Sequence, residues 1–290
     1  GDEVITPPNS FIASTAVIIH LGAIPVFVDV KEDQNIDENL IEKKITKKTK
    51  AIMPVHLTGR MCNMKKISDI SKKYKIPVVE DCAQSIMSSF LNKPSGSWSE
   101  IGCFSAHPLK NLNAMGDGGY LVTNKKNLFL KAKSLINHGM ENRNDISNFG
   151  FVSRMDNVQA AILNYRLKNL KKIIIKRRKN FKIYLNNLDR NSVFFPNEKR
   201  GEFNTYHTFV IQADKRDQLK NFLHRKGIGT SIHYPIPIHL QKAYKRLFKK
   251  KEKYKNSESQ SKSIITLPIN QFLSEKDILF ICKNINKFFN

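Results

Sequence analysis

Two short stretches of the sequence carry residues whose chemistry depends on their surroundings. Lys110 lies among apolar neighbours in residues 102–112, five positions after Ser105. An amine in an apolar setting loses stabilisation of its charge and can act as a nucleophile, although a lone lysine of this kind is more often a surface residue with a buried stem. Glu80 and Asp81 follow the apolar residues 76–79, where the Asp81 carboxylate can cap a helix or pair with a cationic ring nitrogen.

Three further features are weaker candidates for a site. The turn at residues 116–119, Gly-Asp-Gly-Gly, can approach a ligand closely, yet such a turn is usually only a turn. Residues 232–239 contain two prolines, which hold His233 and Tyr234 in a rigid, extended segment. His56 follows a strand-like run, and its spacing leaves open whether it belongs to the core or to a pocket.

Alternating strand and helix patterns in the first half predict the elements that position these residues. Strand-like runs occupy residues 25–30, 51–55, 76–80 and 120–123. We expect helices from near Ser10 to near Gly22, from a cap at Asp37, and over residues 64–74. This order predicts an α/β fold with a mixed, mostly parallel sheet covered by helices on both faces. Ligands of such sheets bind at the carboxyl ends of the strands.

The second half has a different pattern. A helical pattern without Gly or Pro runs from Met155 to Tyr184. After Pro196 we expect a strand at residues 205–212, a helix at 214–226, a second strand at 229–233 and then further helices that end at residue 285. We expect the Lys- and Ser-rich run at 248–263 to be exposed. We therefore predict a large α/β domain over residues 1–170, and a linking helix with a smaller α+β domain over residues 171–290.

Composition excludes several classes of protein. The chain has 290 residues, 40% of them hydrophobic, which excludes a wholly disordered chain, and its apolar runs are shorter than the roughly 20 residues of a membrane helix. The four cysteines show no CxxC spacing, so we expect a reducing, cytoplasmic setting and no metal site. The net charge of +24 is concentrated in the second half and fits a nucleic-acid surface, but we see no nucleic-acid motif and favour a compositional bias toward lysine.

Several longer stretches combine these residues into one pattern. In chain order they are GDEVITPPNSFIAS, GAIPVFVDV, KTKAIMPVHLTGR, IPVVEDCAQS, CFSAHPLKNLNAMGDGGYLVTN, SRMDNVQAAIL, YHTFVIQ and GIGTSIHYPIPIHLQKAY. Together they resemble the DegT-type nucleotide-sugar aminotransferases, which use pyridoxal 5'-phosphate and have the fold-type I architecture. The resemblance implies an enzyme that converts a nucleotide-linked keto sugar into an amino sugar for polysaccharide or glycan biosynthesis, with glutamate as amino donor.

The resemblance also implies a role for individual residues around the cofactor. Lys110 matches the lysine that bonds to the cofactor and later carries the proton, and Asp81 matches the carboxylate that pairs with the ring nitrogen. Gln84 matches a residue near the ring 3-hydroxyl, and Ser105 matches a hydroxyl donor to the cofactor phosphate. Phe11 falls at the aromatic position that stacks on the ring.

Residues of the second half imply a shared site. Arg154, His233 and Tyr234 match residues that reach the substrate pocket from a neighbouring subunit. We therefore expect a homodimer whose active sites are shared, without a specific nucleic-acid or membrane partner.

Two departures from the family pattern leave alternatives open. Relatives normally carry a segment ahead of GDEVI whose backbone N–H groups hold the cofactor phosphate, and we expect this chain to lack it. Val152 stands where many relatives have an asparagine that donates to the same phosphate. Both departures would suit an inactive fragment, or a regulatory or structural homologue. A 3-dehydratase, in which histidine replaces the lysine, is disfavoured by Lys110, although His107 lies three positions earlier.

Overall fold

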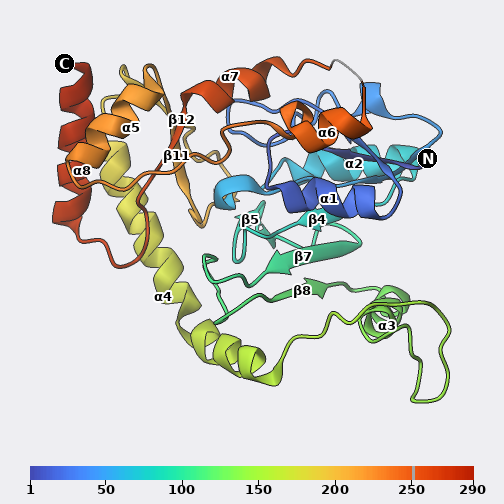
Figure 1. Ribbon diagram of the computed structural model, residues 1–290. Helices are drawn as coiled ribbons and strands as arrows, with labels where there is room; N and C mark the ends of the chain where they lie inside the picture. Colours follow the sequence, from blue (N-terminus) through green and yellow to red (C-terminus); the bar gives the residue numbers. More distant parts are fainter. Residues whose placement is uncertain (250–251) are drawn as a thin grey trace.

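The computed structural model describes residues 1–249 and 252–290 and confirms the α/β class (Figure 1). The first part contains β1 (Glu3–Thr6), α1 (Ile12–His20), β2 (Ile24–Phe27), β3 (Thr49–Ile52), α2 (Met64–Tyr74), β4 (Val79–Asp81), β5 (Ser89–Phe90), β6 (Lys93–Pro94), β7 (Ile101–Ser105), β8 (Gly119–Val122) and α3 (Lys126–Leu135). The second part contains α4 (Asn157–Asn187), β9 (Val193–Phe194), β10 (Glu202–Phe203), β11 (Phe209–Ala213), α5 (Arg216–Arg225), α6 (Lys242–Leu247), α7 (Lys255–Ser263), β12 (Ile264–Leu267) and α8 (Glu275–Phe289).

The strands of the first part form a mixed, mostly parallel arrangement, as the sequence predicts. β1 pairs in parallel with β2 and with β3. β7 pairs in parallel with β4 and antiparallel with β8. Parallel bridges Ile52↔Val78 and Val55↔Asp81 join the two groups of strands. β4 and β7 therefore end at the same edge, where they present Asp81 and Ser105.

Helix α2 shows how the local sequence sets an element. The Asn63 side chain caps its first turn by accepting a hydrogen bond from the Lys66 N–H. Met64, Ile67 and Ile70 recur at helical spacing and are all buried. They pack in the same hydrophobic cluster as residues of β1 and β3. The bounds agree with the predicted range of 64–74 because capping residue and apolar period coincide.

Helix α4 connects two hydrophobic cores. Leu163 and Ile174 pack with Ala106 and Leu112 of the first part. Residues near the other end of the helix, such as Tyr184, belong to the core formed with β11, β12, α5 and α8. Figure 1 shows the helix running from the neighbourhood of β8 to that of α5 and α8. The predicted domain boundary after residue 170 stays a prediction.

Two predicted features are wrong, and a third holds only in part. The helix predicted from Asp37 is a turn followed by a short 3-10 helix at Glu42–Lys44. Instead of a strand at residues 229–233, the structure has one bridge, Ser231↔Thr266. The run predicted as exposed, 248–263, is exposed only in part, because its described lysines are exposed while Ser257, Gln260 and Ser261 of α7 are buried. Positions 250 and 251 of that run lie outside the described residues.

Helix α7 buries one face, and a residue far away in the chain caps its first turn. The Asp29 carboxylate accepts hydrogen bonds from the backbone N–H groups of Asn256 and Ser257, at 2.8 and 3.0 Å. The Ser257 hydroxyl donates to the same carboxylate at 2.8 Å. A carboxylate at the first turn satisfies free N–H groups and matches the positive end of the helix dipole. The lysine-rich segment is therefore held against the first part.

None of the helices in the described part of the chain is both long enough and apolar enough to cross a bilayer.

Replacing Asp29 with alanine should weaken the attachment of α7. We expect Asp29→Ala to lower the free energy of unfolding by about 1–2 kcal/mol, because three hydrogen bonds to the helix N-terminus lose their acceptor. Urea denaturation followed by circular dichroism measures the change. Asp69→Ala, at an exposed position of α2, is the matched control and should leave the unfolding free energy nearly unchanged. Equal midpoints for the two variants would contradict the capping role.

Candidate active site

A cavity of about 420 Å³ lies at the edge where β4 and β7 end. Its volume is in the range of small-molecule sites. The lining contains charged, hydroxyl and aromatic groups from both parts of the chain: Phe11, Ala13, Ser14, Val55, Asp81, Ala83, Gln84, Ser105, His107, Leu109, Lys110, Asp117, Gly118, His207, His233 and Tyr234. Of the eight residues that the sequence singles out for a site, seven line this one cavity, and Arg154 does not.

Asp81 is fixed by neighbours on both of its carboxylate oxygens. Oδ2 accepts a hydrogen bond of 2.7 Å from the Ser14 hydroxyl of α1, and Oδ1 accepts one of 3.0 Å from the Ala83 N–H. The residues after Asp81 form turns and no helix, so the carboxylate is not a helix cap. It is a half-buried anion held at the pocket wall, suited to a cationic ring nitrogen.

Lys110 lines the same cavity as Asp81. Its backbone N–H donates to the His107 carbonyl at 2.8 Å, within the irregular segment that follows β7. Burial lowers the pKa of the Lys110 amine, although the nearby Asp81 carboxylate acts in the opposite direction. A lowered pKa increases the share of neutral amine, which is the nucleophilic form.

Gln84 and Tyr234 are positioned by each other. The Gln84 Nε2 donates to the Tyr234 hydroxyl at 3.4 Å, while its Oε1 accepts from the Thr58 N–H at 2.7 Å. The Phe11 ring lies 6.0 Å from the Tyr234 ring, centroid to centroid, and is more than half exposed. The Ser105 hydroxyl accepts from the His107 N–H at 3.3 Å, so its own hydrogen stays available for a ligand.

The expectation that His233 and Tyr234 reach the pocket from a neighbouring subunit is wrong. Both line the same cavity as Lys110 of their own chain. The segment is anchored there because the Ile238 N–H donates to the Pro8 carbonyl at 2.8 Å, and His233 Nδ1 bonds the Thr266 hydroxyl at 2.9 Å. Burial lowers the pKa of His233, and the positive charge of Lys110 acts in the same direction.

Arg154 lies elsewhere on the chain. It is exposed and lines a separate surface depression with residues of α3, among them Lys131. Val152 is also exposed. That Arg154 of one subunit reaches the substrate pocket of the other therefore stays a prediction.

The sequence did not reveal several residues of the cavity. Ser14 holds Asp81, and its position in a helix of apolar and small residues carries no signal for that role. Asp117 and Gly118 belong to the glycine-rich turn that the sequence left as a weak candidate. His207 lies in the stretch YHTFVIQ, for which the resemblance implies no individual role.

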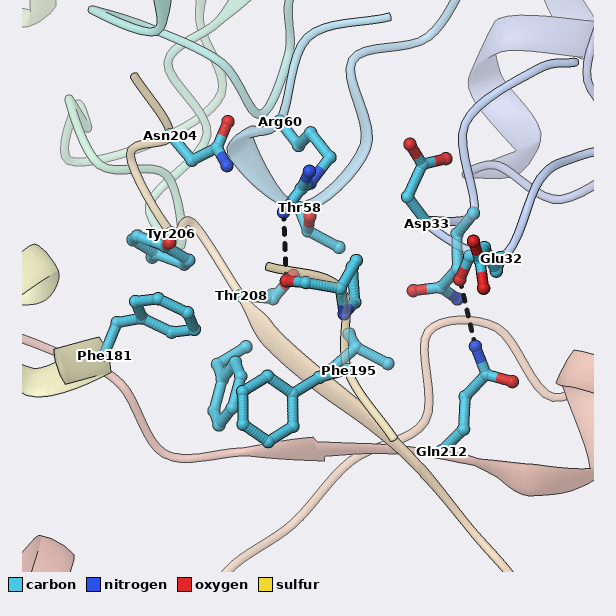
Figure 2. Close-up of a pocket in the computed structure, with 14 residues that line it drawn as sticks. Glu32, Asp33, Thr58, Arg60, Phe181, Phe195, Asn204, Tyr206, Thr208 and Gln212 are labelled. Atoms are coloured by element: carbon cyan, nitrogen blue, oxygen red, sulfur yellow. Dashed lines mark hydrogen bonds between the residues drawn. The ribbon is translucent and has the colours of Figure 1, made fainter. Parts of the chain in front are cut away.

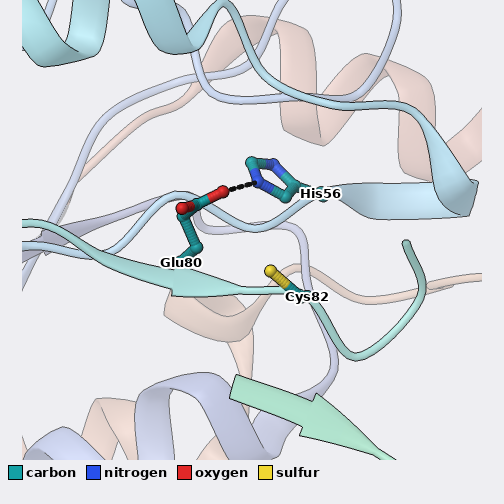
Figure 3. A group of neighbouring side chains, drawn as sticks. All are labelled: His56, Glu80 and Cys82. Atoms are coloured by element: carbon teal, nitrogen blue, oxygen red, sulfur yellow. Dashed lines mark hydrogen bonds and ion pairs between the residues drawn. The ribbon is translucent and has the colours of Figure 1, made fainter. Parts of the chain in front are cut away.

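Behind β4 lies a second cluster, formed by His56, Glu80 and Cys82, whose potential ligand atoms lie within 4.8 Å of one another (Figure 3). His56 Nδ1 accepts from the Cys62 N–H at 3.2 Å, so the ring proton is on Nε2, which donates to Glu80 at 3.0 Å. Burial raises the pKa of the Cys82 thiol well above its usual value. Both histidine nitrogens are occupied and the thiol stays protonated, so the cluster is a hydrogen-bonded core feature and does not suit a metal ion.

Glu80 is the centre of this cluster. Besides His56, its carboxylate accepts hydrogen bonds of 2.8–2.9 Å from the N–H groups of Gly96 and Trp98 and the hydroxyl of Ser99. Burial opposes its charge, but the hydrogen bonds from His56, Gly96 and Ser99 outweigh burial and lower the pKa of Glu80. The buried carboxylate thus ties β4 to the loop before β7.

Comparison with known proteins relates this arrangement to one family. The model of the DegT/DnrJ/EryC1/StrS aminotransferase family matches residues 1–286. The chain is 36% identical to a pleiotropic regulatory protein of Geobacillus stearothermophilus, over 100% of this chain and 79% of the relative. It is 37% identical to a dTDP-3-amino-3,6-dideoxy-alpha-D-galactopyranose transaminase of Aneurinibacillus thermoaerophilus, over 99% and 79% of the two chains.

A solved structure agrees with the fold as well. DesV of S. venezuelae, solved in complex with a ketimine intermediate, superposes with a TM-score of 0.96 at 32% identity. The match covers 99% of this chain and 78% of DesV.

Removal of the Glu80 carboxylate should destabilise the protein strongly at neutral pH. We expect Glu80→Ala to lower the unfolding free energy by about 3 kcal/mol, because the buried donors of His56 and the loop lose their acceptor. Since the pKa of Glu80 is lower in the folded state, its contribution is present above the unfolded-state pKa of about 4.3 and is lost as the pH falls through the folded value.

Urea denaturation of the wild-type protein and the variant at neutral and acidic pH measures this. The difference between the two should shrink in acid. Glu42→Ala, which removes an exposed pair with Lys73, is the control and should change stability by less than about 1 kcal/mol at either pH. A difference for Glu80→Ala that stays constant with pH would contradict the role of the charge.

Proposed function

Because the chain belongs to the DegT/DnrJ/EryC1/StrS aminotransferase family, we propose that it is a pyridoxal-phosphate-dependent aminotransferase that converts a nucleotide-linked keto sugar into an amino sugar. The observation that carries this proposal is that Lys110 and Asp81 both line one cavity of about 420 Å³. The proposed role of the product is in polysaccharide or glycan biosynthesis.

The residues of the cavity fit the cofactor. When bound, pyridoxal phosphate supplies an electron sink for the carbon that gains or loses the amino group. The Lys110 amine, with its lowered pKa, is the nucleophile that holds the cofactor and the base that carries the proton. The Asp81 carboxylate, held by Ser14 and Ala83, keeps the ring nitrogen protonated.

Other residues of the wall complete the cofactor site. Gln84 lies where it can bond the ring 3-hydroxyl, and Ser105 has a free hydroxyl hydrogen for the phosphate. Phe11 offers an exposed aromatic face to the ring. An intact set of these groups supports an active enzyme over an inactive homologue.

The donor, the assembly and the location are finer parts of the proposal. Glutamate is the proposed amino donor. The proposed assembly is a homodimer in which Arg154 of one chain serves the cavity of the other, while His233 and Tyr234 serve their own. A cytoplasmic location agrees with the four free thiols, all within the described residues, because such thiols persist in reducing compartments.

Replacement of Lys110 should abolish both cofactor attachment and turnover. The wild-type protein with pyridoxal phosphate should show an absorbance band near the visible edge and lose it when L-glutamate is added, since the amino group passes to the cofactor. Lys110→Ala should lack the band and lower the rate with a nucleotide-linked keto sugar by at least about a thousandfold.

Lys72→Ala, at an exposed position of α2, is the matched control and should keep both properties. A wild-type protein that shows no band with the cofactor would contradict the proposed function.

A mixing experiment tests the shared site. Lys110→Ala and Arg154→Ala chains, co-expressed with different tags and purified as the mixed dimer, should regain about half of the wild-type activity, because one of the two sites has both residues intact. Lys110→Ala mixed with His233→Ala should regain none, because these two residues line the cavity of one chain. Recovery with His233→Ala, or none with Arg154→Ala, would contradict the proposed assignment of residues to subunits.

A further inference from the structure

His207 lines the cavity but has no part in the site described so far. It lies between β10 and β11, in residues 205–208, where the chain enters the second core. A histidine in such a place is either a core residue with satisfied nitrogens or a group kept for a ligand. The surroundings of these four residues decide between the two.

The backbone of residues 205–208 is held from several directions. The Thr205 N–H donates to the Gly59 carbonyl at 3.0 Å, and the Thr205 hydroxyl shares a 2.9 Å hydrogen bond with Ser88. The Thr208 N–H donates to the Thr58 carbonyl at 3.4 Å. Figure 2 shows these two residues close together in the wall of a small neighbouring pocket. Loops of the first part therefore hold this segment on both sides of His207.

Arg177 of α4 adds a third attachment. Its Nη1 donates to the carbonyls of Tyr206 and His207, at 2.9 and 3.1 Å, and the side chain is buried. Burial lowers the pKa of this guanidinium to about 10. A buried cation that bonds two successive carbonyls fixes the direction in which the side chain between them points.

Tyr206 is held in an uncommon conformation. Its φ is 48°, in the left-handed region that non-glycine residues seldom adopt, and its ring stacks on Phe181 at 4.2 Å. Strained residues persist where surrounding contacts determine them, and they cluster at functional sites. The strained turn and the Arg177 contacts together orient the side chain of His207 toward the cavity.

The part of the chain that the structure describes does not supply a hydrogen-bond partner for every nitrogen of the His207 imidazole. Among the described residues, its buried Nδ1 has no hydrogen-bond partner. Burial lowers the pKa of His207 well below its usual value, and the charges of Lys110, Arg177 and His233 act in the same direction. A neutral imidazole offers one donor and one acceptor, and it carries no charge to match a carboxylate.

We propose that His207 is a specificity-determining residue that hydrogen-bonds an uncharged oxygen, a hydroxyl or carbonyl, of the keto sugar. The inference rests on the proposed function. A sugar oxygen suits this residue better than the amino donor does, because the carboxylates of glutamate bond more strongly to cationic donors than to a neutral imidazole. His207 therefore contributes to the second half-reaction, in which the sugar binds and receives the amino group.

The test separates the two halves of the reaction. His207→Gln keeps a donor and an acceptor, His207→Leu removes both, and His224→Leu, at an exposed position of α5, is the matched control. Stopped-flow absorbance follows L-glutamate reacting with the cofactor-loaded protein. The aminated protein is then mixed with a panel of UDP- and dTDP-linked 3-keto and 4-keto sugars, and the sugar that the wild-type protein uses fastest is taken forward.

We expect His207→Leu to lower kcat/KM for the sugar about tenfold, mainly through KM, because a buried hydrogen bond to the substrate is lost. Its glutamate half-reaction should stay within about twofold of wild type. His207→Gln should recover most of the loss and keep the wild-type pH profile, since the histidine stays neutral. The control should match the wild-type protein in both halves.

Equal losses in both half-reactions for His207→Leu, without recovery in His207→Gln, would overturn the inference in favour of a structural role. Wild-type sugar kinetics in His207→Leu would overturn it as well. Either result leaves the proposed function standing, because the wild-type protein still transfers the amino group. A wild-type protein that reacts with neither glutamate nor any sugar would overturn the proposed function and this inference together.

Discussion

Strand β4 carries two carboxylates on opposite faces, and the candidate active site depends on this alternation. Successive side chains of a strand point to opposite sides. Glu80 therefore faces the core, where His56 and the loop before β7 hold it, while Asp81 faces the cavity and Lys110. The backbone of Asp81 is fixed as well, since its N–H donates to Pro54 and its carbonyl accepts from His56. A buried anion on one face of the strand thus positions the anion that lines the candidate active site on the other.

Local sequence predicts those parts of the fold and site that depend on local interactions. The bounds of α2 follow from a cap and an apolar period, and the end of an apolar run predicts that Asp81 lies at the end of a strand. The strand predicted at residues 229–233 is wrong, because the one bridge formed there depends on Thr266, which is distant in the sequence. Ser14 and His207 carry no local signal, since each acquires its neighbours only when distant segments meet.

The excess of positive charge is partly internal. Arg60 bonds Glu202 and the carbonyls of Pro196 and Asn197, so it joins the first part of the chain to the second. Arg177 and Arg216 are also buried, and each bonds two backbone carbonyls. A guanidinium group with five donors suits this use, because it satisfies several acceptors from separate segments at once. These three arginines therefore act as cross-links between separate segments of the chain.

The contact that caps α7 joins two segments that the ribosome synthesises at widely separated times. Asp29 and Ser257 are 228 positions apart, yet the carboxylate of one completes the helix of the other. A ribosome releases residue 29 long before residue 257, so during synthesis the early segment has no access to the helix that covers it. Contacts of such high sequence separation form late and slow folding. The first part of the chain therefore reaches its final packing only after translation of α7, and until then its exposed surface is open to chaperones.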